Sequence, residues 1–169
     1  MSGIIGAVGV IACSVGRVLG ACEFEEEPVE EIKDYFVTEI ASSALYAVIC
    51  QDLPEAKIEI WDYNHYLPSE VDCVEIIEDV CINMPPYRVD RRDCENFAIN
   101  FVARVNEKYA LNNFFIAVGE SPMGRHGYVY WVATAPDGSI VRYILEPQTA
   151  DIWPYDPAKG YIPDTLILA

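Results

Sequence analysis

Three strand-like runs in the second half of the chain constrain its fold most. They cover Phe114 to Val118, Gly127 to Ala133 and Ser139 to Leu145, and they are rich in Val, Ile, Tyr and Phe. The dipeptide Asp137-Gly138 lies between the second and third runs and favours the tight turn of a β-hairpin. The pattern predicts an antiparallel sheet made from neighbouring segments of the chain.

Helical periodicity is typical of the first half. Apolar residues recur at helical spacing from Glu25 to Asp52, and again from Val71 to Ile82 after a capping Ser69. Lys57 to Trp61 alternates like a short strand, and residues 156–169 read as a loop with a short apolar tail. The expected fold class is α+β, with helices followed by an antiparallel sheet.

A cysteine, a histidine and an acid stand at the ends of these expected elements. Cys94 lies at the start of a predicted helix that runs to about Tyr109, His126 leads one strand and Glu146 ends the next. A thiol is a good nucleophile only as the thiolate, and a helix N-terminus or an imidazolium lowers its pKa. The order therefore predicts a Cys–His–acid site in which Cys94 attacks, His126 is the base and Glu146 orients the imidazole.

Two details bear on this hypothesis. The chain contains two histidines, so His126 is nearly forced as the partner of a reactive Cys94. Gln148 is a second candidate for the orienting role, because an amide can also hold an imidazole in place.

Three short segments resemble the motifs of a known superfamily. Asp93 to Ala98, Gly124 to Tyr128 and Leu145 to Thr149 look like those of the transglutaminase-like or papain-like cysteine peptidases. The likeness is to small bacterial and phage-encoded members and to the protease domain of a mushroom agglutinin. It covers residues 87–156, which is under half of the chain.

The resemblance implies a papain-like or transglutaminase-like fold with Cys94 as nucleophile, His126 as base and Glu146 as orienting acid. It also implies a cysteine hydrolase or acyltransferase, with a peptidase, amidase or transglutaminase-like reaction on a protein, peptide or other acyl substrate. Two positions depart from the family pattern. Gly127 stands where a small residue other than glycine is common, and Tyr130 stands where asparagine is common.

Calcium is the one cofactor that the resemblance suggests, and the thiol mechanism itself requires none. The agglutinin relatives need calcium, and Asp90, Asp93 and Glu95 could supply oxygen ligands for it. The alternative is that these acids form a helix start that the helix dipole favours, with nearby arginines as surface partners.

The net charge restricts the class of partner. The formal charge of the 169-residue chain is −16 with only 11 Lys and Arg, which argues against nucleic acid and favours a neutral or cationic partner. The six cysteines match no zinc-site spacing and include no C-x-x-C pair, so the disulfide pattern and the redox compartment stay open.

Residues 1–22 form an apolar N-terminal arm ahead of a single expected domain, residues 23–169. The arm reads as a signal segment with a lipobox at Leu19 to Cys22, as a membrane-inserting or self-associating helix, or as an arm packed within an assembly. Export, lipid anchoring and a place in a virion are all compatible with it.

A function without catalysis is the alternative to the thiol enzyme. A catalytically inactive member of the same fold would serve as a structural or binding protein of a virion or cell surface. The observation that separates the two hypotheses is whether Cys94 and His126 lie within hydrogen-bonding reach of each other.

Overall fold

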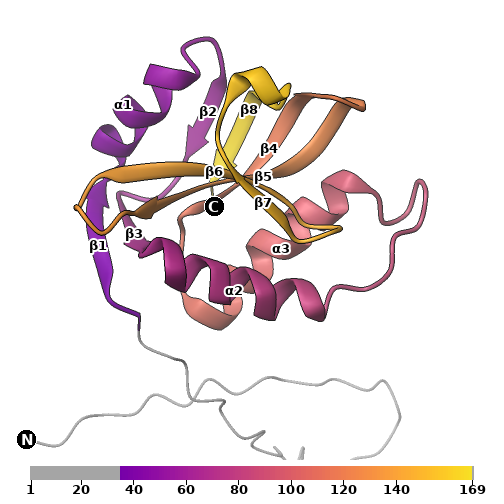
Figure 1. The fold of residues 1–169 in the computed structure, drawn as a ribbon, viewed down its shortest axis with the longest axis horizontal. Helices are drawn as coiled ribbons and strands as arrows, with labels where there is room; N and C mark the ends of the chain where they lie inside the picture. The colour runs from indigo at the N-terminus through magenta and orange to yellow at the C-terminus, as the bar shows by residue number, and fades with distance from the viewer. Residues whose placement is uncertain (1–34, 169) are drawn as a thin grey trace, which may run out of the picture. The chain divides into compact units, whose positions relative to one another are not determined.

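The computed structural model describes residues 35–168, which belong to one unit of the chain, residues 33–169. These residues form three α-helices, eight strands and a 3-10 turn, Pro157–Lys159 (Figure 1). The helices are α1 (Ser42–Asp52), α2 (Glu70–Ile82) and α3 (Cys94–Tyr109). The strands are β1 (Val37–Ala41), β2 (Lys57–Ile60), β3 (Asn64–Pro68), β4 (Phe114–Ser121), β5 (Gly124–Thr134), β6 (Ile140–Glu146), β7 (Asp151–Pro154) and β8 (Ile162–Leu168).

The strands form two sheets. β1 and β3 make a small antiparallel pair, and the main sheet has the strand order β2-β8-β4-β5-β6-β7. Every neighbouring pair in the main sheet is antiparallel except β2 and β8, which run parallel. Hairpins therefore join β4, β5, β6 and β7, as expected where antiparallel neighbours follow one another in the chain.

Strand β5 lies inside the main sheet and is covered on both faces. Eight consecutive residues, from His126 to Ala133, are buried. Side chains alternate across a strand, so the even-numbered residues 128–132 enter one hydrophobic cluster and the odd-numbered residues 129–133 enter another. A strand buried on both faces reads as a continuous apolar run, which is the sequence pattern seen here.

The helices are divided between the two faces. α1 contributes Leu45 and Ile49 to the cluster of the even-numbered face. α2 and α3 pack together on the opposite cluster, where Phe101 of α3 meets Phe114 of β4 edge to face. Figure 1 shows α1 on one side of the sheet and α2 and α3 on the other.

Several sequence expectations are confirmed. The three strand runs are β4, β5 and β6, and Gly138 adopts a left-handed φ of 83° in the turn between the last two. Helix α2 begins after Ser69, whose hydroxyl accepts the backbone N–H of Asp72 at 3.1 Å. The broad assignment to mixed helix and sheet is therefore correct.

The expected order, helices first and sheet second, is wrong. Residues Val37–Ala41 are the strand β1 and not part of a long helix, because they pair antiparallel with β3. Helical periodicity in this stretch is overridden by pairing with a strand that follows α1 in the chain. The start of the expected helix, residues 25–34, lies outside the described residues.

The C-terminal segment also differs from the expectation. Residues 162–168 form the strand β8, inserted between β2 and β4, and not a loop with an apolar tail. Leu166 and Leu168 are fully buried, whereas Ile162 is 45 % exposed. The short apolar run is not recognisable as a strand in the sequence, because its pairing partners, β2 and β4, are distant along the chain.

The apolar arm, residues 1–22, lies outside the described residues, as do Cys13 and Cys22. Within residues 35–168 the four cysteines Cys50, Cys73, Cys81 and Cys94 are free thiols. No helix in this described part is both long and apolar enough to cross a membrane.

We predict that β8 is essential for stability. Leu166→Ala should lower the free energy of unfolding by about 2–5 kcal/mol, because it leaves a cavity in the core. Ile162→Ala, in the same strand but exposed, should cost less than about 1 kcal/mol. Chemical denaturation of both variants measures the difference, and equal losses would mean that β8 is not packed as described.

Candidate functional site

The start of helix α3 is fixed by reciprocal capping. Asp93 accepts from the backbone N–H of Asn96, and the Asn96 side chain accepts from the Asp93 backbone N–H at 3.4 Å. This capping box satisfies two amides that a helix start leaves without partners. Cys94 is thereby held in the first turn of the helix, as the sequence predicts.

His126 is positioned by the turn between β4 and β5. Ser121 Oγ accepts the Met123 N–H at 3.1 Å and donates to the Gly124 carbonyl at 2.8 Å. Gly124 has a φ of +99°, a conformation that glycine adopts without strain. His126 follows two residues later in β5. Its side chain is buried, and its ring stacks on that of Tyr128 with 6.1 Å between the ring centroids.

Glu146, at the end of β6, is the partner of His126. Its Oε2 lies 2.6 Å from His126 Nε2, and both side chains are about nine-tenths buried. An ionised carboxylate only accepts, so Nε2 carries the proton in this bond and Nδ1 is left as the basic nitrogen. The other oxygen, Oε1, is buried and no described residue donates to it.

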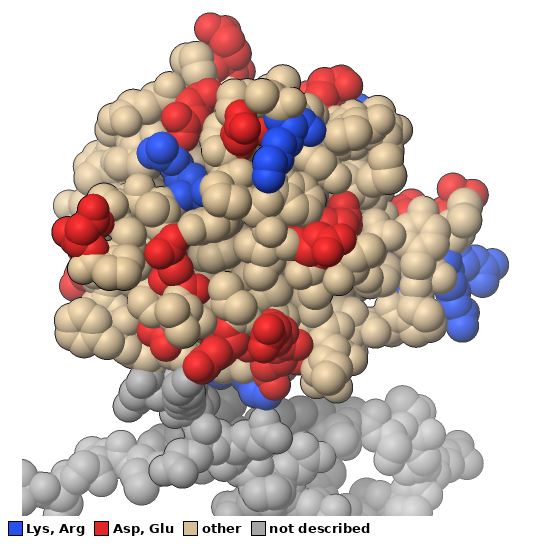
Figure 2. Space-filling model, in the orientation of Figure 1, with Lys and Arg blue, Asp and Glu red and all other residues tan. Residues whose placement is uncertain are grey.

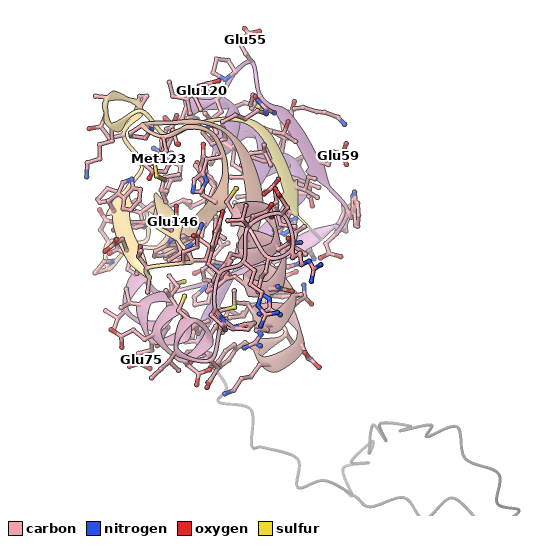
Figure 3. All side chains as sticks on the ribbon, turned by 90° about the vertical axis from the view of Figure 1, so that its right-hand side faces the viewer. Glu55, Glu59, Glu75, Glu120, Met123 and Glu146 are labelled. Carbon is pink, nitrogen blue, oxygen red and sulfur yellow. The ribbon has the colours of Figure 1, made fainter. Side chains whose placement is uncertain are left out.

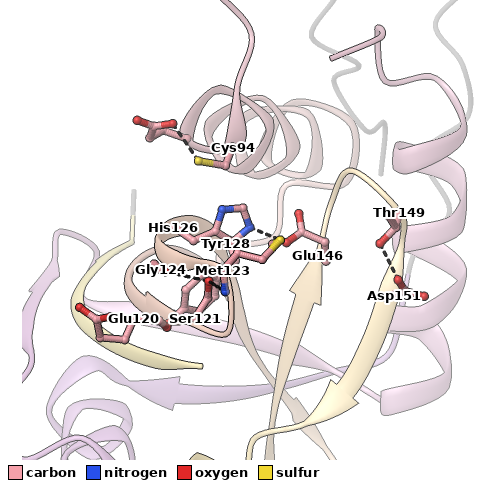
Figure 4. A network of polar contacts seen from close by, with 11 residues as sticks. Cys94, Glu120, Ser121, Met123, Gly124, His126, Tyr128, Glu146, Thr149 and Asp151 are labelled. Carbon is pink, nitrogen blue, oxygen red and sulfur yellow. Dashed lines mark hydrogen bonds and ion pairs between the residues drawn. The ribbon is translucent and has the colours of Figure 1, made fainter. Parts of the chain in front are cut away.

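Figure 4 shows Cys94 at the start of α3, beside the ring of His126 and on a different side of that ring from Glu146. The thiol nevertheless donates its hydrogen to Glu95 Oε2 at 3.0 Å, and no hydrogen bond joins it to His126. Burial raises the pKa of Cys94, the Glu95 carboxylate raises it further, and the Gly127 amide opposes this change. The expectation of a lowered thiol pKa is therefore wrong for this resting arrangement.

Gly127 is the point where helix α3 meets strand β5. A β-carbon placed on Gly127 would lie 2.9 Å from both the N and the Cα of Glu95. Such contacts are too short for any side chain, so the absence of one allows the helix start to approach the strand. The sequence flagged Gly127 only as a departure from a family pattern, and its packing role appears in three dimensions.

The other nominated residues do not join this cluster. Gln148 is exposed in the turn after Glu146. The hydrogen bond to His126 comes from Glu146 and not from Gln148. Asp90 lies in the loop before α3 and has a φ of 58°. Asp93 caps α3, and Glu95 accepts the hydrogen bond of the Cys94 thiol. Across residues 35–168 no group of three His, Cys, Asp or Glu side chains comes together to hold a metal ion. Calcium binding thus stays a prediction from the sequence.

Acidic side chains lie in scattered patches on a surface that is mostly neither acidic nor basic (Figure 2). On the face in Figure 2 they are spread widely, and most of the Lys and Arg side chains stand apart from one another. In Figure 3, Glu55, Glu59 and Glu75 lie at the periphery, whereas Glu146 lies inside the outline of the molecule and is only 7 % exposed. Glu146 is thus set apart from the solvated acids by its burial.

A cavity of about 510 Å³ lies elsewhere, beside the start of α2. Its lining is mainly apolar and includes Phe36 and Leu67, together with residues of β1, α2 and the end of β5 that carry hydroxyl or carboxylate groups. The polar lining residues are Thr38, Ser69, Glu70, Asp72 and Thr134. The residues that line it include no Lys or Arg, and sequence reasoning missed this site because its members are scattered along the chain.

Comparisons with known proteins show the fold but no family. No family model and no curated protein matches the chain. Among solved structures it is similar to the PSL1a-E64 complex, with a TM-score of 0.60 and 18% identity over 76% of this chain and 51% of that one. It is also similar to Polyporus squamosus lectin bound to the human-type influenza-binding epitope Neu5Aca2-6Galb1-4GlcNAc, with a TM-score of 0.57 and 19% identity over 76% of this chain and 49% of that one.

The chain therefore spans about half the length of these structures, and identities this low show a shared fold only. The similarity to these two structures contradicts the resemblance to the papain-like or transglutaminase-like cysteine peptidases. The classification as a bacterial or phage thiol protease is contradicted with it. A cysteine at a helix start, a histidine on a strand and an acid at a strand end are local features of many mixed folds. Three short motifs are too little to identify a family.

We predict that Gly127→Ala disturbs the site through packing. The new methyl group must displace the start of α3, which should cost about 1–3 kcal/mol of unfolding free energy and change the alkylation rate of Cys94. Gly138→Ala is the matched control, because a β-carbon there meets nothing and the cost arises only from its φ of 83°. An unchanged Cys94 alkylation rate in Gly127→Ala would contradict the contact.

Proposed function

We propose that this chain is a binding protein whose ligand is a carbohydrate held in the cavity beside α2. The observation that carries the proposal is the cavity of about 510 Å³, a mainly apolar hollow whose lining includes a few polar residues. Such a hollow is the usual form of a small-molecule site. Lectin structures are among those with a similar fold, which supports binding better than it supports catalysis.

The lining of the cavity suits a neutral sugar. Phe36 is 89 % exposed and offers an apolar ring face, while Thr38, Thr134 and two carboxylates offer hydrogen-bonding oxygens. The hydroxyl of Tyr143 donates to Glu70, and Ser69 Oγ donates to Asp72 Oδ2 at 2.7 Å, so both acids are held in place. Their charge and the net charge of −16 disfavour an anionic sugar.

The experiment is a titration of the chain with the lectin epitope in two forms, with and without its Neu5Ac residue. We expect the form without the acidic sugar to bind more tightly, because the carboxylates of Glu70 and Asp72 repel a second carboxylate. Phe36→Ala should weaken this binding about three- to tenfold through the lost ring contact. Tyr63→Ala, an 85 % exposed aromatic outside the cavity, is the matched control. Failure of both sugars to bind would overturn the proposal.

A second candidate function is thiol chemistry at Cys94, and the buried pair of His126 and Glu146 favours it. With Nε2 bonded to Glu146 at 2.6 Å, Nδ1 is the ring nitrogen that is left to accept a proton. In the proposed step Nδ1 takes the thiol proton, Sγ bonds the carbonyl carbon of an acyl ligand, and Glu146 stabilises the imidazolium. The imidazolium gives its proton to the amine or alcohol of the ligand as the bond from that group to the carbonyl carbon breaks, which leaves a thioester. Water or an amine, which loses a proton to Nδ1, then attacks the thioester and releases the thiol.

We predict that iodoacetamide alkylates Cys94 by a route that depends on His126. At neutral pH, His126→Ala should slow the reaction roughly 10- to 100-fold if the ring acts as a base. Glu146→Gln should slow it less, because the ring remains although its partner loses charge. Peptide mapping resolves Cys94 from Cys50, which serves as the internal control. Equal rates in wild type and His126→Ala would eliminate this candidate and leave binding alone.

A further inference from the structure

The hydrogen of the Cys94 thiol is directed to its neighbour in sequence. The distance from Sγ to Glu95 Oε2 is 3.0 Å, and the donor in this bond is the thiol because a carboxylate only accepts. A thiol has one hydrogen, so this bond competes with a bond to His126. The resting site therefore holds the sulfur in a form that the imidazole has not deprotonated.

The backbone around this bond is fixed from two sides. The capping box holds Asp93 and Asn96, and Gly127 presses against the backbone of Glu95 itself. The Glu95 side chain, in contrast, is exposed and can rotate away without moving α3. Rotation of the Glu95 side chain would therefore remove the acceptor of the thiol hydrogen without moving the helix start.

The electrostatics agree with the geometry. The carboxylate of Glu95 contributes to the raised pKa of Cys94, and the thiol bond in turn lowers the pKa of Glu95. A negative charge beside a thiol disfavours the thiolate, which would be a second negative charge. At neutral pH this neighbour therefore opposes the activation of Cys94.

We propose that Glu95 is a positioning residue that locks the Cys94 thiol away from His126, and that a cationic group on a ligand opens the lock by pairing with Glu95. The inference rests on the thiol chemistry proposed for Cys94. A guanidinium or ammonium group bound to Glu95 removes the competing acceptor and neutralises the charge beside the sulfur. The same interaction would select ligands that carry a positive charge, in agreement with the acidic surface of the chain.

The test is the rate of Cys94 alkylation by iodoacetamide between pH 6 and 10, with EDTA present so that no metal ion occupies Glu95. We expect Glu95→Gln to raise the rate at neutral pH about three- to tenfold and to move the midpoint of the pH profile downward. Glu107→Gln, an exposed acid on the same helix, is the matched control and should change neither. Glu95→Asp keeps the charge on a shorter side chain, and we expect an intermediate profile.

The cationic opening is tested with agmatine against sodium chloride at equal ionic strength. Agmatine should accelerate the alkylation of wild-type Cys94 and should have no effect on Glu95→Gln. A Glu95→Gln profile that coincides with wild type would overturn the lock, and equal acceleration by agmatine and sodium chloride would overturn its opening by a ligand.

Failure of the lock and failure of the thiol chemistry give different results. If Glu95→Gln accelerates alkylation and the added change His126→Ala abolishes the gain, the lock acts on the thiol–imidazole pair, as proposed. If the double variant keeps the full gain, Glu95 affects the thiol by charge alone, and the proposed release toward His126 is wrong. Circular dichroism of each variant confirms that the fold is retained.

Discussion

The contact between the start of helix α3 and Gly127 of strand β5 determines much of this structure. Because Gly127 has no side chain, the backbone of Glu95 can lie against the strand, and the helix then packs along the face that carries Trp131. The same contact places Cys94 against Gly127, the residue that follows His126 in β5. Packing of the core and placement of the Cys94 thiol therefore depend on the same contact.

The site combines a buried, hydrogen-bonded pair of side chains, His126 and Glu146, with a partly buried thiol. His126 and Glu146 lie in a region with little solvent, where a bond of 2.6 Å between charged or polar partners is strong and removal of one partner is costly. Cys94 is only partly buried and bonds an exposed side chain. The His126–Glu146 pair is fixed by burial, whereas the hydrogen bond of the Cys94 thiol can change through rotation of the Glu95 side chain alone.

Two separate regions therefore offer chemistry on one small fold. The cavity beside α2 has the shape and the oxygen groups of a binding site, while the Cys94 region has the groups of a nucleophilic site. Both are rich in carboxylates, so each favours neutral or cationic ligands over anionic ones.

Local signals predicted those parts of the structure that depend on neighbours in sequence. Ser69 and Asp93 mark the starts of α2 and α3, and Asp137-Gly138 marks a hairpin, because caps and turns are formed by residues a few positions apart. The pairing of His126 with Glu146 could also be predicted from the sequence, since both residues lie near the ends of the two strands that the Asp137-Gly138 hairpin joins. Such contacts need no knowledge of the remote chain.

Features that depend on distant segments could not be predicted in this way. β8 is recognisable as a strand only from its place between β2 and β4, and β1 only from its pairing with β3. The cavity is lined by residues from three separate stretches of the chain. By itself the sequence determined the starts of α2 and α3, the hairpin at Asp137-Gly138 and the order of Cys94, His126 and Glu146. Only the tertiary structure decided that the thiol bonds Glu95, because packing of α3 on Gly127 and burial of the sulfur set which acceptor it meets.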